Sequence, residues 1–152
     1  MSGLLTNLPE MPRQGGTVAV LAVSSWDEDH ARLRDILRYP NWKIHSARAW
    51  GEAVQLLRRR RTGVVICERD FPDGAWQDLL ERLGTLPHPP PMIVTSRYAD
   101  ETLWAEVLNL GGYDVLAKPF DVPEVIRIVS LARLRWKESL RPVRSAAAVA
   151  RA

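Results

Sequence analysis

The residues of this chain best suited to chemistry stand at the ends of four short apolar segments. They supply one carboxylate, one ammonium group and four hydroxyls: Ser24, Ser25, Glu68, Thr95, Ser96 and Lys118. A carboxylate and an ammonium group that lie close together pair directly, because opposite charges attract. Serine hydroxyls are neutral and are weak ligands for magnesium. We therefore expect an ion pair between Glu68 and Lys118, weak or absent magnesium binding, and no other cofactor.

The sequence lacks the residue patterns of other reactive sites. The single cysteine, Cys67, excludes an internal disulfide and a cysteine-based zinc site, and its apolar neighbours indicate a core position. The three histidines share no ligand spacing, and there is neither a glycine-rich phosphate loop nor a Ser/His/Asp combination. We therefore do not expect an enzyme.

The elements that must position these residues alternate regularly. Apolar, β-branched segments predict strands, and apolar residues at helical spacing, such as Leu33, Ile36 and Leu37, predict helices between them. The expected strands are 17–23, 42–47, 63–67, 91–96 and 113–117. The expected helices are 27–38, 51–61, 75–83, 100–110 with Asp100 as its cap, and a last helix from near Asp121 past residue 135 towards Pro142. This alternation predicts a doubly wound parallel sheet with helices on both faces and a ligand site at the carboxyl ends of the strands.

Length and composition indicate one folded domain. The chain has 152 residues, of which 46% are hydrophobic and 26% charged. These values suit a single globular domain and exclude wholesale disorder. We expect a flexible leader over 1–16, the domain over 17–140 and a basic flexible tail over 141–152. No apolar stretch reaches the roughly eighteen residues of a membrane span, and the N-terminus does not resemble a secretory signal, so we expect a cytoplasmic protein.

Positive charge gathers near the C-terminus. Residues 133–152 hold six basic residues and one acid, while the whole chain has a net charge of +3. The preceding residues are therefore slightly acidic. A basic segment of this kind is usually solvated, but it can also contact nucleic acid. Nucleic-acid binding through this segment remains an alternative function. Arg58–Arg61, at the end of a predicted helix, are interpreted as a solvated helix end.

Three segments carry a resemblance to a known family. They read VVICERDFPDG around the third strand, MIVTSRYADE around the fourth and LGGYDVLAKPF around the fifth. Over about residues 17–135 the chain resembles a response-regulator receiver domain of two-component signalling. The resemblance implies a flavodoxin-like (βα)5 fold with strand order 2-1-3-4-5. It also implies a phosphoryl group accepted by an aspartate, a divalent ion held by acids, and a Thr and a Lys that contact the phosphoryl group.

The resemblance assigns positions to the residues named above. Glu68 stands at the phosphoacceptor position, and Ser24 and Ser25 stand at the positions of the acidic pair. Thr95, Lys118 and Pro119 match the residues that contact the phosphate and switch the domain, with a cis bond before the proline. A standard site has three carboxylates and one lysine, whereas here only Glu68 and Lys118 remain.

We therefore expect an atypical site with little phosphorylation. Glu68 is one methylene longer than aspartate, so it can partly imitate a phosphoryl group; a degenerate site with a simple ion pair is an equal alternative. Asp70 and Asp73 are interpreted as turn residues, and Asp27 and Glu28 as acids of a first helical turn rather than metal ligands.

Residues 100–135 form the face that this family commonly uses for dimerisation or partner binding. Trp104 follows the inward Leu103 and is a candidate exposed anchor, with packing in the core as an equal alternative. Val115 occupies the position of an aromatic residue that rotates on activation, and valine cannot rotate in that way. Tyr113 is expected on the same face of the strand as Val115.

Together these features predict a stand-alone, atypical receiver module that acts by protein–protein contact, independently of phosphorylation. Its expected partner is a signalling protein such as a histidine kinase, or a second copy of the chain; no membrane partner is expected. A conventional phosphorelay regulator, phosphorylated by a histidine kinase, is the main alternative.

Overall fold

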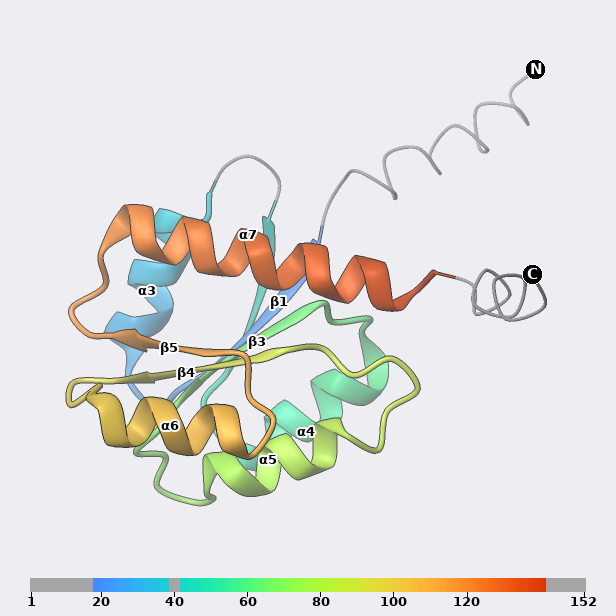
Figure 1. The fold of residues 1–152 in the computed structure, drawn as a ribbon, viewed down its shortest axis with the longest axis horizontal. Coiled ribbons are helices and arrows are strands. Elements are labelled where there is room, and N and C mark those ends of the chain that lie inside the picture. Colours follow the sequence, from blue (N-terminus) through green and yellow to red (C-terminus); the bar gives the residue numbers. More distant parts are fainter. Residues whose placement is uncertain (1–17, 39–41, 142–152) are drawn as a thin grey trace.

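The computed structural model describes residues 18–38 and 42–141, which form a five-stranded sheet and five helices (Figure 1). The strands are β1 (Val18–Val23), β2 (Trp42–Ala47), β3 (Val64–Glu68), β4 (Met92–Ser96) and β5 (Asp114–Ala117). The helices are α3 (Asp27–Ile36), α4 (Trp50–Arg59), α5 (Trp76–Leu83), α6 (Glu101–Asn109) and α7 (Val122–Ser139). All ten elements lie within three residues of their expected bounds, and α7 extends past residue 135 to Ser139, as expected. The leader over 1–16 and the tail from 142 onwards lie outside the described residues.

The sheet is parallel throughout, with the order β2-β1-β3-β4-β5. Helices α3 and α7 cover one face, and α4, α5 and α6 cover the other (Figure 1). This arrangement confirms the predicted fold class. It also brings the carboxyl ends of all five strands to one edge, where the helices α3 to α7 begin.

Each face of the sheet has its own apolar core. Leu21, Val65 and Met92 belong to the core under α4, α5 and α6, whereas Ile66 and Ile93 belong to the core under α3 and α7. All five residues of β3 are buried, because a central parallel strand is covered on both sides. Full burial of a leucine or valine side chain stabilises the fold by about 1.5–3 kcal/mol.

Side-chain caps begin two of the helices, and a buried tryptophan anchors the end of α7. Asp100 accepts a hydrogen bond from Leu103 N at 2.9 Å and caps α6. Asp121 accepts one from Glu124 N at 3.1 Å and caps α7. Helix α7 continues to Ser139, and its Trp136 is buried with Nε1 donating to the His88 carbonyl at 3.2 Å.

One expectation about side-chain direction is wrong. Val115 packs against the core under α4, α5 and α6, but Tyr113 packs against the core under α3 and α7. The reason is that β5 begins only at Asp114, so Tyr113 precedes the strand and its two-residue alternation. The Tyr113 ring instead lies 5.5 Å from the Arg135 guanidinium of α7.

Among the described residues, no helix is long and apolar enough to span a bilayer.

Candidate functional site

The candidate site is a buried ionic cluster at the carboxyl edge of the sheet. Glu68 is the last residue of β3, and Lys118 follows β5. The strands are parallel, so these residues meet although fifty positions separate them in the sequence. The Lys118 Nζ contacts Glu68 Oε1, which is the ion pair that the sequence predicts. The side chains of Glu68 and Lys118 are 3% and 8% exposed, respectively.

Asp29 is a third member of the cluster, and the sequence analysis did not identify it. Its Oδ2 lies 2.9 Å from Lys118 Nζ and accepts a hydrogen bond from Ser24 Oγ at 2.7 Å. The expected count of one carboxylate and one ammonium group is therefore wrong, because two carboxylates share Lys118 and the cluster has a net charge of −1. Asp29 stands four residues before the inward Leu33, so both lie on one face of α3. This four-residue spacing from Leu33 is the sequence signal from which the inward position of Asp29 could have been predicted.

The electrostatics of Lys118 reflect two opposing causes. Burial alone lowers the pKa of a lysine, because it disfavours the charged form. Hydrogen bonds and charge attraction from Glu68 and Asp29 together outweigh burial, so the pKa of Lys118 lies above its ordinary value. Lys118 is therefore a fixed cation at neutral pH, held between two carboxylates.

Ser24 and Ser25 have different surroundings, although the resemblance places both at the acidic-pair positions. Ser24 is buried, and its Oγ also accepts a hydrogen bond from Trp26 N at 3.1 Å. Ser25 is exposed. The Ser24 carbonyl accepts a hydrogen bond from His30 Nε2 at 2.8 Å. Burial lowers the pKa of His30 below its ordinary value, although this hydrogen bond opposes the shift, and the ring is therefore neutral.

The switch positions lie beside the cluster. Thr95 is buried and pairs with Glu68 in the register of β3 and β4. Within the described residues, the Glu68 carboxylate contacts Lys118 and accepts a hydrogen bond from Asp70 N at 2.8 Å, and it makes no hydrogen bond to Thr95. The peptide bond between Lys118 and Pro119 is cis, as the resemblance implies.

Trp26 and Arg97 form a cover over the cluster that the sequence analysis also missed. The Trp26 ring centroid lies 4.2 Å from the Arg97 guanidinium and 5.2 Å from Lys118 Nζ. These cation–π contacts join the loops that follow β1, β4 and β5. Beside them opens a cavity of about 360 Å³, whose lining includes Asp29, Arg97 and Lys118.

The other acids of this region lie outside the cluster. Asp27 is exposed and pairs with Arg48, whose hydrogen bond and charge lower the pKa of Asp27. Glu28 lines the cavity. Asp70 and Asp73 are exposed in the turn after β3, in agreement with their interpretation as turn residues.

A magnesium ion of the kind that the resemblance implies does not fit these residues. Magnesium is usually held by one or two carboxylates and several waters in octahedral geometry. Here both buried carboxylates already bind the Lys118 ammonium, and the paired-acid positions carry hydroxyls. In the described ranges, no group of three or more Asp, Glu, His or Cys side chains is arranged to hold a metal. An ion would have to displace Lys118.

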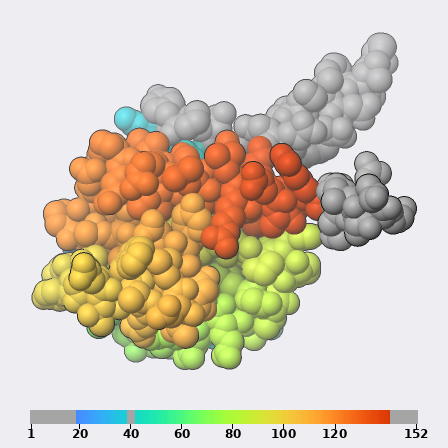
Figure 2. Space-filling view, in the orientation of Figure 1, coloured from blue at the N-terminus to red at the C-terminus, as the bar shows by residue number. Residues whose placement is uncertain are grey.

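The face formed by residues 100–135 exposes several apolar side chains. Trp104 on α6 is 50% exposed, Leu110 after α6 is 53% exposed and Ile126 on α7 is 39% exposed. Figure 2 shows the surfaces of α6 and α7 adjoining on one side of the molecule. Of the two alternatives that the sequence left open, Trp104 is exposed and does not pack in the core. Val115 is only partly buried in the strand between these helices.

Comparison with protein families identifies the chain. Residues 26–130 match the response regulator receiver domain, a segment that includes Asp29, Glu68, Thr95 and Lys118. The chain belongs to the response-regulator receiver family. Receiver domains of response regulators act in two-component signalling, and they are signalling proteins rather than classical enzymes. The matched segment begins directly after Ser25.

Known relatives agree with this assignment. The chain is 33% identical over 121 residues to the probable transcriptional regulatory protein TcrX of Mycobacterium tuberculosis, covering 78% of this chain and 51% of TcrX. It is 26% identical to the response regulator protein PilR of Pseudomonas aeruginosa, covering 74% of this chain and 26% of PilR. The receiver thus spans about half or less of the length of these relatives.

Solved structures show the same fold. The signal receiver domain of an HD domain-containing protein from Pseudomonas fluorescens has a TM-score of 0.71 at 28% identity, with 81% of this chain and 98% of that domain covered. A CheY-like receiver domain protein from Methanospirillum hungatei has a TM-score of 0.72 at 17% identity, with 81% and 98% covered.

Proposed function

We propose that this receiver acts in signal transduction through protein contacts and does not accept a phosphoryl group. The observation that carries the proposal is the double engagement of Lys118 by Asp29 and Glu68. In the family, the corresponding lysine contacts the phosphoryl group. Here the lysine already has two buried anionic partners within the domain.

A phosphoryl group accepted by Glu68 would convert its carboxylate into an acyl phosphate and place nearly two negative charges beside the buried Asp29 carboxylate. Two unit charges about 4 Å apart repel by about 4 kcal/mol at an effective dielectric constant near 20. A conventional site relieves such repulsion with a divalent ion, which this donor set does not accommodate. The unmodified cluster, in which Lys118 balances both carboxylates, therefore disfavours phosphorylation.

The Glu68 carboxylate makes one of the contacts that a phosphoryl group would make. It reaches Lys118, as the sequence analysis anticipates, but it carries one negative charge where a phosphoryl group carries nearly two. Without a bond to Thr95, the imitation is incomplete. The cluster is thus a constant feature of the receiver, in place of one that forms and decays with phosphorylation.

Intact-mass spectrometry after incubation with magnesium and acetyl phosphate tests the proposal. The wild-type chain is expected to keep its mass. A phosphoryl adduct on the wild type would refute the proposal and favour the conventional phosphorelay regulator, and peptide mapping would then locate the acceptor.

A matched variant makes an unmodified wild type informative. Ser24→Asp/Ser25→Asp/Asp29→Ser/Glu68→Asp places carboxylates at all three positions that the family uses and removes the Asp29 contact from Lys118. This variant is expected to gain a phosphoryl group from the same donor. Glu68→Asp alone, with the serines retained, is expected to remain unmodified because the paired acids are still missing.

We further propose that partner contact is made by the 100–135 face. Its exposed Trp104, Leu110 and Ile126 are large apolar side chains on adjoining elements, and such side chains anchor protein interfaces. The occupant is a signalling protein, such as a histidine kinase, or a second copy of the receiver. Trp104→Ala tests this face, because Trp104 is exposed on α6.

A further inference from the structure

The end of the molecule opposite the ionic cluster carries an arginine-rich surface. Each helix of this fold begins at the carboxyl edge of the sheet and ends at the amino edge. A few cations at helix C-termini are therefore expected from the helix dipole. Four consecutive arginines, Arg58–Arg61, exceed that expectation, and Arg60 and Arg61 lie beyond the last residue of α4.

Contacts between elements join these arginines to basic residues of α7 and β2. The Arg61 guanidinium lies 5.4 Å from the ring centroid of Trp136 in α7. The Arg133 guanidinium of α7 lies 5.5 Å from the ring centroid of Trp42, where β2 begins. We define the basic edge as the following six basic residues: Lys43, Arg58, Arg59, Arg60, Arg61 and Arg133. In Figure 1, α7 ends and α4 connects to β3 towards the right-hand side of the fold.

The positive charge of the basic edge is uncompensated. Arg58–Arg61 are all exposed, and among residues 18–38 and 42–141 none of them forms an ion pair with a carboxylate. The effect reaches a neighbouring side chain: burial lowers the pKa of His45, and the charges of Arg60 and Lys43 lower it further.

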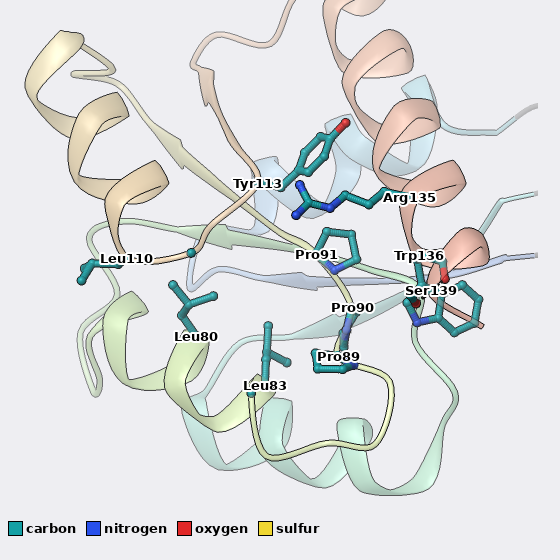
Figure 3. Close-up of a pocket in the computed structure, with 12 residues that line it drawn as sticks. Leu80, Leu83, Pro89, Pro90, Pro91, Leu110, Tyr113, Arg135, Trp136 and Ser139 are labelled. Atoms are coloured by element: carbon teal, nitrogen blue, oxygen red, sulfur yellow. Dashed lines mark hydrogen bonds between the residues drawn. The ribbon is translucent and has the colours of Figure 1, made fainter. Parts of the chain in front are cut away.

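Arg135 has a different direction and is not part of this surface. Figure 3 shows Arg135 extending from α7 toward Tyr113, beside a cavity of about 310 Å³ whose lining includes Leu83 and Pro91. The Arg135 guanidinium is held 5.5 Å from the Tyr113 ring centroid. In the basic edge, Lys43 on β2 and Arg58–Arg61 at the end of α4 are exposed, whereas Arg133 on α7 is half-buried against Trp42.

We propose that the basic edge binds the phosphate backbone of a nucleic-acid duplex without reading its base sequence. Arginine guanidinium groups donate paired hydrogen bonds to phosphate oxygens. A duplex presents one negative charge per roughly 1.7 Å of its axis, which complements a run of adjacent arginines. The proposal goes beyond the signalling role of the receiver and uses none of its site residues.

The surroundings favour a duplex over a single strand or a membrane. Single-strand binding depends on bases stacking on open aromatic rings, but Trp42 and Trp136 are covered by Arg133 and Arg61. Membrane surfaces are bound with the help of exposed apolar side chains. Within the described ranges, the α4 and β2 parts of the basic edge expose no large apolar side chain, and the exposed Leu131 and Leu134 lie on α7, on either side of Arg133 in the sequence.

Fluorescence anisotropy with the full chain and a labelled DNA duplex of about two helical turns tests the proposal. Two duplexes of unrelated sequence are expected to bind equally, with affinity that falls steeply between about 50 and 200 mM salt. Arg58→Gln/Arg59→Gln/Arg60→Gln is expected to lose at least about tenfold in affinity and to flatten the logarithmic salt slope by about three. NMR titration of His45 provides the folding control. A higher His45 pKa in a folded variant would show that the positive charge of Arg60 no longer acts on this ring.

A charge-matched variant separates the surface from net charge. Arg32→Gln/Arg69→Gln/Arg127→Gln removes the same charge around the other end of the molecule and is expected to stay within about threefold of the wild type. An equal loss in both variants would overturn the proposal, because net charge alone would then explain binding. Loss on Arg144→Gln/Arg151→Gln alone would overturn it in favour of the tail. Absence of duplex binding, with or without capture by anionic vesicles, would also overturn it.

Discussion

Lys118 and the two carboxylates that hold it determine the character of the receiver site at the scale of single residues. Asp29 is buried, as Glu68 is, and it accepts a hydrogen bond from Ser24 and pairs with Lys118. Asp29 thus brings a carboxylate from the first turn of α3 next to Ser24, one of the positions at which the resemblance implies an acid. This carboxylate pairs with Lys118.

Asp29→Asn tests this role of Asp29. The variant is expected to lose about 1.5–3 kcal/mol of unfolding free energy, because a buried charge-assisted hydrogen bond is weakened. Asp27→Asn is the matched control two residues earlier, where the carboxylate pairs with Arg48 but is exposed. It should cost less than about 1 kcal/mol. Urea denaturation measures both, and equal losses would contradict a structural role for the Asp29–Lys118 contact.

At the scale of elements, α6 and α7 each carry one tryptophan of interest, Trp104 and Trp136, and the two differ in structural role. Trp136 is 9% exposed and fixes the last turns of α7 to the loop containing His88. Trp104 is 50% exposed and makes no comparable anchor within the described part of the chain. The first is a packing residue, while the second is available to a partner.

Alanine variants of these two tryptophans are expected to separate stability from association. Trp136→Ala should cost about 3–5 kcal/mol of unfolding free energy, because it empties a buried site. Trp104→Ala should change stability by less than about 0.5 kcal/mol but weaken self-association or partner binding. Denaturation and analytical ultracentrifugation provide the two readouts. A Trp104→Ala variant that associates like the wild type would exclude this residue as an anchor of the 100–135 face.

At the scale of the whole molecule, the topology separates the two kinds of charge. All five described helices start at the carboxyl edge, where acids cap them or fill their first turns, and all but α6 carry a basic residue in the last turn, at the amino edge. The ionic cluster and the basic edge therefore occupy opposite ends of one rigid sheet. Contacts at one end need not disturb the other.

The stability of the whole fold is expected to fall as the solution is acidified from neutral pH. His30 and His45 both have a folded-state pKa below the ordinary value of 6.5, with burial as the main cause. Below about pH 6.5 the unfolded chain therefore binds more protons than the folded chain. The contribution of these histidines to the free energy of unfolding is fully present above about pH 6.5 and is lost as the pH falls through the folded-state pKa values. Urea denaturation between about pH 7.5 and 5 measures the slope. His30→Gln should flatten it, and an unchanged slope would assign the effect elsewhere.

The sequence by itself determined the order and kind of every described element. The alternation of β-branched segments with helical spacing predicted the parallel sheet, and motifs such as LAKPF predicted which residues would stand at its carboxyl edge. These inferences succeed because strand and helix periods are local, and a parallel sheet places all its strand ends together. Glu68 and Lys118 were predicted to pair for the same reason.

Only the tertiary structure decided which further groups joined that pair. Asp29 contacts Lys118 across 89 positions of the chain. The Trp26 ring contacts both Arg97 and Lys118, and these three residues lie in three separate loops. Tyr113 turned to the opposite core because β5 begins one residue later than its apolar pattern suggests. Such contacts depend on where the first turn of a helix or the first residue of a strand lies in space, and a shift of one residue redirects the side chain.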